Sequence, residues 1–215
     1  MTRTLPRMTR RLAGGIALAG AALMLPAFAQ GPAPVAASST HQAAPRVKLA
    51  TSAGDIVIEV YPDKAPKTVE NFLQYVRDKH YDGTIFHRVI DNFMIQGGGY
   101  DARYAQKPTR APIPHEGREA LARGGPRNVT GTIAMARTMD PNSASAQFFI
   151  NVKDNAFLDH TAPTMQGYGY TVFGKVVAGM DVVNRIKSQP TGPGGPFPSD
   201  VPRTAVVIQS ATILP

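Results

Sequence analysis

Short runs of alternating apolar and polar residues, separated by turn-forming residues, constrain the fold of this chain more than any other feature. The clearest run is DIVIEV at 55–60, which a Thr-Ser-Ala-Gly turn joins to a similar run at 47–50 in the pattern of a β-hairpin. Further strand-like runs cover 84–90, 93–96, 130–136, 146–152, 170–177 and 205–214. Seven or eight short strands predict a mostly β fold, and closure into a barrel would remove exposed strand edges.

Two segments have helical spacing instead. Residues 66–79 carry an apolar stripe at i, i+3, i+4 and i+7, after a proline and before an Asp-Gly pair, and a shorter helix is predicted for 180–187. The three glycines at 97–99 predict a tight strand end. The polar segment 100–128 and the Pro- and Gly-rich segment 189–202 are predicted to be loops.

The N-terminus has the pattern of an export signal. A basic stretch at 3–11 precedes an uncharged apolar run at 12–25, and Ala27-Phe28-Ala29 has the small residues that a signal peptidase reads. The apolar run is shorter than the roughly 20 residues that a spanning helix needs, which disfavours an uncleaved anchor. The sequence therefore predicts a signal peptide over 1–29, a flexible leader over 30–45 and one domain over 46–215. We expect a periplasmic protein with no stable membrane insertion after cleavage, and outright secretion is the alternative.

Charge and cysteine content exclude several classes of function. The chain has 23 Lys and Arg against 15 Asp and Glu, but four of the arginines lie in the first eleven residues. The remaining excess is small and dispersed, so nucleic-acid binding is not predicted. Without any Cys, the chain has no disulfide, thiol nucleophile or thiolate-bound zinc.

Arg88 stands out because it lies in a strand-like run of apolar neighbours. Two-residue alternation would place Phe86, Arg88 and Ile90 on one face of that strand. An arginine there must either be paired or face a site, and Glu59 and Asp91 are the candidate partners for a structural ion pair.

A second segment, 146–151, also separates two faces. Gln147 and Phe149 alternate with Phe148 and Ile150, so we expect Phe148 in the core and Phe149 in a surface groove. The serines lie outside any G-x-S-x-G context, which disfavours a hydrolase.

These segments resemble the cyclophilin family of peptidyl-prolyl cis–trans isomerases, particularly its exported bacterial members. The resemblance spans about 47–215, and its motifs occur in the family's order at 86–98, 131–137, 145–151, 157–159 and 172–176. It implies a closed eight-stranded antiparallel β-barrel capped by two α-helices. It also implies an active site on the outer surface of the barrel, because side chains fill the interior.

The resemblance further implies which residues carry the reaction. The family's catalytic arginine corresponds to Arg88, with Gln96 as a polar catalytic contact. The other substrate-binding positions correspond to Phe93, Met94, Ala136, Arg137, Gln147, Phe149, Phe157, Leu158 and Tyr170. The implied substrates are proline-containing unfolded or partly folded polypeptides, and neither a metal nor a cofactor is implied.

Three positions depart from the family pattern. Arg137 stands where the family often has Asn, and Phe157 stands where eukaryotic members carry Trp, so weak binding of cyclosporin is expected. Tyr170 replaces the family's pocket histidine after an insertion near 161–169.

The residue types suit rotation about an X-Pro bond. The reaction breaks no covalent bond, so it requires no nucleophile, general base, metal or cofactor. Amide resonance is lost as the bond twists, and the proline nitrogen regains a lone pair to which a guanidinium can donate.

Two other functions remain open at this point. A proline-binding chaperone or scaffold would bind unfolded chains without depending on Arg88. A specific envelope partner would be recognised through the loops at 100–127 or 161–169. The protein is expected to be a monomer.

Overall fold

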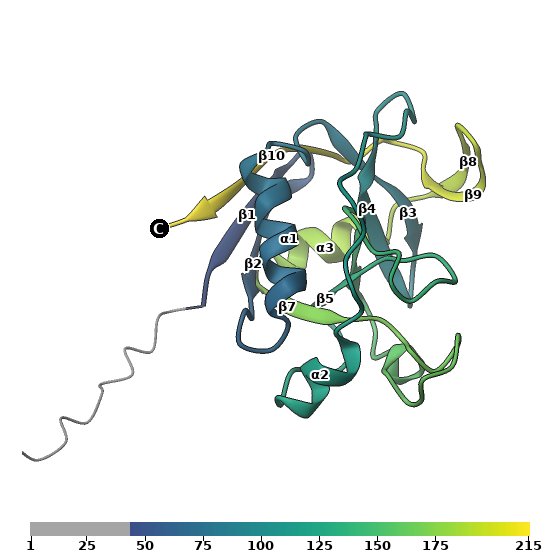
Figure 1. Ribbon diagram of the computed structural model, residues 1–215. Helices are drawn as coiled ribbons and strands as arrows, with labels where there is room; N and C mark the ends of the chain where they lie inside the picture. Colours follow the sequence, from purple (N-terminus) through teal and green to yellow (C-terminus); the bar gives the residue numbers. More distant parts are fainter. Residues whose placement is uncertain (1–43) are drawn as a thin grey trace, which may run out of the picture. The chain divides into compact units, whose positions relative to one another are not determined.

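Eight antiparallel strands close into a barrel in the computed structural model, which describes residues 44–215 (Figure 1). Neighbouring strands follow the order β1-β10-β3-β4-β6-β5-β7-β2, and every pair is antiparallel. The strands are β1 (Arg46–Thr51), β2 (Gly54–Val60), β3 (Thr84–Ile90), β4 (Met94–Asp101), β5 (Thr132–Met135), β6 (Phe148–Asn151), β7 (Val172–Ala178) and β10 (Val207–Leu214). The predicted closed barrel is therefore confirmed. The predicted signal peptide, and the leader up to residue 43, lie outside the described residues.

Large apolar side chains fill the barrel, so its interior is a packed core. Phe86, Phe148 and Phe173 are fully buried there, and the ring of Phe148 meets that of Phe86 edge to face with 6.2 Å between centroids. The residues opposite each other in β1 and β2, such as Val47 and Ile58, also point inward and are fully buried. Burial of this much apolar surface is the main favourable term in folding.

Two helices pack their apolar faces against this core, at the places predicted. Helix α1 (Pro66–Arg77) buries Phe72, whose ring lies 5.0 Å from that of Phe173. Helix α3 (Met180–Lys187) buries Val183 and Ile186. In Figure 1, α1 lies in the foreground and α3 farther back. None of the described helices is long and apolar enough to cross a membrane.

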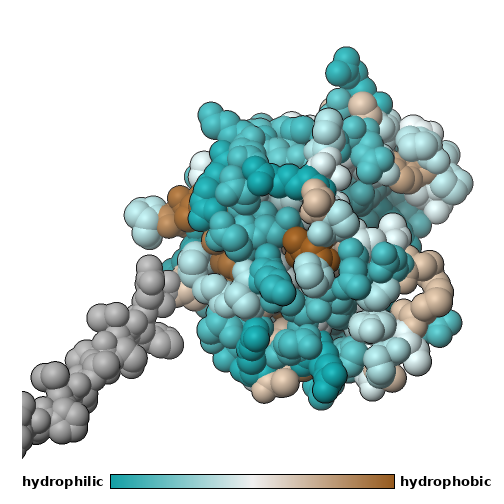
Figure 2. Space-filling model, in the orientation of Figure 1, coloured by the Kyte–Doolittle hydropathy of each residue, from teal (hydrophilic) through white to brown (hydrophobic). Residues whose placement is uncertain are grey.

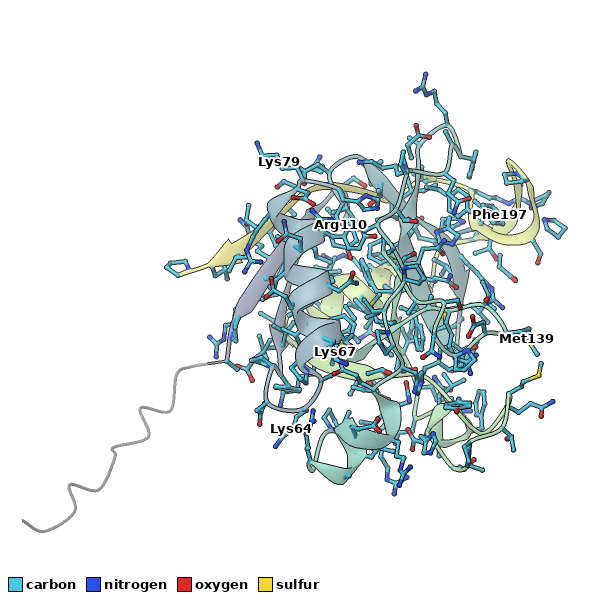
Figure 3. The ribbon with its side chains drawn as sticks, in the orientation of Figure 1. Lys64, Lys67, Lys79, Arg110, Met139 and Phe197 are labelled. Atoms are coloured by element: carbon cyan, nitrogen blue, oxygen red, sulfur yellow. The ribbon has the colours of Figure 1, made fainter. Side chains whose placement is uncertain are left out.

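Four short elements occur where loops or no regular structure were predicted. Helix α2 (Gly117–Ala122) lies within the polar segment, and a single 3-10 turn, η1, covers Ala156–Leu158. Strands β8 (Thr191–Gly194) and β9 (Phe197–Pro202) form a separate two-stranded sheet. This hairpin lacks alternation, but it carries Phe197, which Figure 3 labels. The ring of Phe197 packs on those of His87 and Tyr100, with centroids 5.3 and 5.0 Å away.

The glycines at 97–99 do not end a strand, contrary to the prediction. β4 passes through them to Asp101, and Gly97 still pairs with Phe86 and Phe148 on either side. A Cβ on Gly98, whose φ is +85°, would lie 2.8 Å from the ring of Tyr81. The glycines are thus required by close packing and backbone conformation.

Candidate active site

The register of the sheet brings three of the predicted site residues into one row on the outside of the barrel. Arg88 on β3 pairs with Gln96 on β4, Gln96 pairs with Phe149 on β6, and Phe149 pairs with Ala134 on β5. Residues directly opposite each other in antiparallel strands point to the same face. A cation, an amide and an aromatic ring therefore lie side by side, although 61 residues separate Arg88 from Phe149 in sequence.

Alternation along β6 separates the core from this outer face, as predicted. Phe148 and Ile150 belong to the barrel core. Phe149 belongs to a second, outer apolar cluster with Met94 and Leu158, and it is also largely buried. The outer cluster supplies an apolar surface beside the polar row.

A pocket of about 180 Å³ opens on this outer face. Its lining contains nine of the eleven residues predicted from the sequence, namely Arg88, Phe93, Met94, Gln96, Ala136, Arg137, Phe149, Leu158 and Tyr170. The other two adjoin it. Gln147 lines the next depression along the surface, together with Gln96, and Phe157 is 71% exposed with its ring stacked on that of Phe93 at 5.8 Å.

Arg88 reaches this pocket with its donors free. Its side chain is exposed and makes no hydrogen bond or ion pair with any described residue. The two candidate partners are engaged elsewhere, since Glu59 pairs with Arg46 and Asp91 with Lys187, both at 3.1 Å. The structural ion-pair interpretation of Arg88 is therefore wrong.

The predicted face-sharing of Phe86 with Arg88 is also wrong. The β3–β4 register shifts between Phe86 and Arg88, so the simple two-residue period breaks there. Phe86 consequently points into the barrel core, whereas Ile90, two residues after Arg88, packs against the outer cluster.

Gln96 is oriented by a neighbour on the same face. Its Nε2 donates a hydrogen bond to Oε1 of Gln147 over 3.0 Å. This bond leaves the second N–H of Gln96 and its Oε1 atom for other partners. This second N–H of Gln96 can donate to a carbonyl oxygen of a peptide held between Arg88 and Phe149.

The family comparison agrees with this geometry. The sequence model of the family described as "Cyclophilin type peptidyl-prolyl cis-trans isomerase/CLD" matches residues 46–213. The chain belongs to this family. It is accordingly a peptidyl-prolyl cis–trans isomerase, an enzyme class that acts on proline-containing peptides.

Several curated relatives and solved structures are similar over most of the domain. A peptidyl-prolyl cis-trans isomerase cyp18 from Streptomyces antibioticus is 60% identical over 78% of this chain and 98% of its own length. Peptidyl-prolyl cis-trans isomerase B from Escherichia coli K12 is 53% identical over the same shares. Peptidyl-prolyl cis-trans isomerase A from Dickeya dadantii is 48% identical over 92% of this chain and 96% of its own. The crystal structure of cyclophilin AquaCyp293 from Hirschia baltica is 26% identical, covers 78% of this chain and 73% of that one, and has a TM-score of 0.60.

Arg137 and Tyr170, at which the sequence predicts departures from the cyclophilin pattern, contact each other. The guanidinium carbon of Arg137 lies 4.8 Å from the centroid of the Tyr170 ring. Arg137 Nε donates to the backbone oxygen of Gly169 over 2.8 Å, and its other nitrogens donate to backbone oxygens of Thr138, Met139 and Met165. The side chain of Arg137 therefore holds the loop at 161–169 against the pocket.

His87 precedes Arg88 on β3, at the register shift. It is buried between the rings of Tyr100 and Phe197, and its Nδ1 atom has no hydrogen-bond partner. Burial lowers its pKa to about 4, against a smaller opposing effect of the Ile85 backbone. The ring is thus neutral, and it supports the strand that carries Arg88.

The sequence did not single out three buried asparagines beneath the pocket, at 128, 151 and 155. Asn151 could have been found, because it lies two residues after Phe149 and so shares its face. Within residues 44–215, no group of three or more His, Asp or Glu side chains is placed to hold a metal ion.

Proposed function

We propose that the pocket rotates X-Pro bonds with Arg88 as the catalytic donor. The uncatalysed rotation has a barrier of about 18–20 kcal/mol, because amide resonance must be lost. At the twisted state the proline nitrogen carries a lone pair that only a donor can stabilise. The unpaired guanidinium at a pocket with an apolar wall is the observation that carries this proposal.

The apolar lining would hold the proline ring while the acyl side turns. Phe93, Met94, Phe149 and Leu158 offer only carbon and thioether surface to a ring in the pocket. Gln96, which Gln147 orients, would donate to the carbonyl oxygen of the bond. Binding of the ring in both isomers and stabilisation of the twisted state are then separate tasks of separate residues.

Substitution of Arg88 tests the assignment. One charge-assisted hydrogen bond is worth about 1.5–3 kcal/mol, so we expect Arg88→Ala to lower kcat/KM about 10- to 100-fold. The measurement is NMR exchange spectroscopy on a proline tetrapeptide with the purified domain. Arg77→Ala, which removes an exposed ion pair with Glu70, is the matched control and should retain full activity. Equal rates for Arg88→Ala and the parent protein would refute the role of Arg88.

We also propose that the enzyme assists the folding of exported proteins in the periplasm. The support is the signal-like pattern over 1–29 and the proline chemistry of the pocket. Expression of the full chain in a bacterium, followed by fractionation and intact mass, tests this location. We expect a periplasmic species that starts at Gln30, and a cytoplasmic species that retains residues 1–29 would refute it.

A monomer is the proposed state of the mature protein. The face shown in Figure 2 is largely hydrophilic, with apolar side chains only in small separate patches. Stable self-association normally uses a larger contiguous apolar area. Light scattering at several concentrations should give the mass of one chain, and a concentration-independent dimer mass would contradict the proposal.

A further inference from the structure

Three buried asparagines form a head-to-tail chain of hydrogen bonds beneath the pocket. The amide nitrogen of Asn155 donates to the side-chain oxygen of Asn151 over 2.8 Å. That of Asn151 donates to the side-chain oxygen of Asn128 over 3.2 Å and to Thr132 Oγ1 over 3.0 Å. All three asparagines are at most 2% exposed. Side chains linked in this way polarise and rigidify one another in a low-dielectric interior.

The asparagines at both ends of this hydrogen-bonded series donate to backbone oxygens of pocket-lining residues. At one end, Asn155 Nδ2 donates to the oxygen of Phe93 over 2.9 Å. At the other, Asn128 Nδ2 lies 3.1 Å from the oxygen of Leu158 and 3.4 Å from that of Tyr170. The three asparagines therefore link two parts of the pocket lining, Phe93 at one end and Leu158 with Tyr170 at the other, through side-chain amides.

The linked pocket residues lie outside the strands of the barrel. Met94 and Phe149 lie within strands, so the ladders of the sheet set their positions. Phe93 lies in the turn between β3 and β4, Leu158 in η1 and Tyr170 just before β7. Backbone bonds reach these residues, from Val152 N to the Phe93 oxygen over 3.1 Å and from Tyr170 N to the Leu158 oxygen over 2.8 Å. The asparagine amides add side-chain bonds to the same two oxygens.

A buried carboxylate anchors the Asn128 end. Asp159 Oδ1 accepts from the backbone nitrogen of Asn128 over 2.8 Å and from its Nδ2 over 3.0 Å. Arg127 neutralises this carboxylate from the surface, with 3.1 Å between the charged groups. The amide of Asn128 is thus oriented both by Asp159 and by the backbone oxygens that it bonds.

We propose that Asn128, Asn151 and Asn155 are positioning residues of the isomerase pocket, which set the spacing between the wall at Phe93 and the wall at Leu158 and Tyr170. This inference rests on the proposed function of the pocket. Loss of one of these hydrogen bonds weakens binding of the proline ring in the ground state and in the twisted state by the same amount. Such uniform loss of binding raises KM and leaves kcat nearly unchanged.

Two buried threonines offer a matched test. Thr132 and Thr84 each donate from Oγ1 to the backbone oxygen three residues earlier, over 2.7 Å in both cases. Only Thr132 also accepts a hydrogen bond from Asn151. Thr132→Val should raise KM, and the dissociation constant of a proline tetrapeptide, about threefold, a change typical of a weakened hydrogen bond. Thr84→Val should change neither.

A stronger variant removes Asn155, the asparagine at one end of the hydrogen-bonded series. Asn155→Ala deletes both donors of that amide, and we expect KM about tenfold higher with kcat within about twofold. The peptide is titrated into folded protein, whose folding is checked by circular dichroism. A merely structural role would lower the free energy of unfolding without changing KM or the dissociation constant.

The possible outcomes separate this proposal from that for Arg88. Unchanged KM in both Thr132→Val and Asn155→Ala overturns the positioning role, and so does an equal rise of KM in Thr84→Val. If Asn155→Ala does not fold, the threonine pair decides. Absence of isomerisation by the parent protein would instead refute the proposed function.

Discussion

The two sides of the pocket are held in place by different physical means. On the side of Phe93, Leu158 and Tyr170, buried amides donate to the backbone oxygens of the wall residues. On the side of Arg88, support comes from aromatic packing, because His87 on the same strand is enclosed by Tyr100 and Phe197. Directional bonds fix the walls, whereas the arginine side has a packed strand and a free side chain.

This difference follows from what each side must do. A wall that grips a ring needs a fixed spacing, and hydrogen bonds with defined angles provide it. A guanidinium that donates to a substrate loses that ability when it is already paired. Arg88 accordingly has a position set by β3 and no partner among the described residues.

The largest effect is expected on the wall side, from loss of the Phe149 ring. Phe149 is 4% exposed, and its ring lies edge to face with that of Tyr170 at 5.4 Å. Phe149→Ala should lower the free energy of unfolding by about 3–5 kcal/mol and weaken peptide binding, because a cavity replaces the wall. Urea unfolding and peptide titration measure the two effects. Normal peptide affinity in the folded variant would show that this ring is only part of the core.

On the arginine side, the neutral His87 predicts a loss of stability in acid. Burial depresses its folded pKa to about 4, so protonation favours the unfolded chain. The contribution of the neutral His87 ring to the free energy of unfolding is fully present above pH 6.5, the ordinary pKa of histidine. About 3 kcal/mol of this contribution is lost as the pH falls to 4.

The variant His87→Phe isolates this contribution. It keeps an aromatic ring between Tyr100 and Phe197 but cannot titrate, whereas His80 and His115, whose pKa values burial also lowers, remain. Urea unfolding at pH 7.5 and 4.5 should show a smaller loss for His87→Phe than for the parent protein. Identical losses would mean that His87 does not titrate between these pH values.

The sequence predicted those parts of the fold whose pattern is periodic. β3 and α3 have the bounds expected from alternation and helical spacing. The β8–β9 hairpin has no such pattern, and it is supported by contacts of Phe197 with residues about 100 positions earlier in the chain. Contacts of this kind leave no local periodicity, so α2 and this hairpin could not be derived.

For the site, the motifs located nearly every lining residue but not the means by which the walls are held. The register shift that turns Phe86 inward depends on backbone pairing with β4, which side-chain alternation does not reveal. The asparagine chain joins residues that lie 23 positions apart in sequence. Only the folded chain brings their amides together.

A smaller effect is expected from Arg137, which connects the loop at 161–169 to the pocket wall at Tyr170. Arg137→Ala removes the contact with the Tyr170 ring and the bonds to the backbone oxygens of Gly169 and Met165. We expect a rise of KM equivalent to about 1–2 kcal/mol. Arg137→Lys should not restore the parent value, because an ammonium lacks the planar fork that reaches several oxygens. Full activity of Arg137→Lys would contradict this account.

The smallest effect on activity is expected from Glu116, which anchors a helix rather than a pocket wall. Its buried carboxylate accepts from the backbone nitrogens of Lys67 and Thr68, over 3.2 and 2.8 Å, at the N-terminus of α1. Glu116→Gln replaces one acceptor by a donor and removes a charge that the helix dipole favours, so the free energy of unfolding should fall by about 1 kcal/mol. Since neither Glu116 nor α1 lines the pocket, KM should stay unchanged.

Glu116 therefore tests whether any buried polar anchor influences the pocket. Peptide titration of Glu116→Gln beside Thr132→Val compares two buried polar side chains, of which only that of Thr132 bonds to the asparagines that hold the pocket walls. The bond from the backbone nitrogen of Glu116 to Thr171 does not involve the exchanged carboxylate. A raised KM in Glu116→Gln would mean that general softening of the barrel controls binding. An unchanged KM, with lower stability, would assign the effect in Thr132→Val to the direct link between its hydroxyl and Asn151.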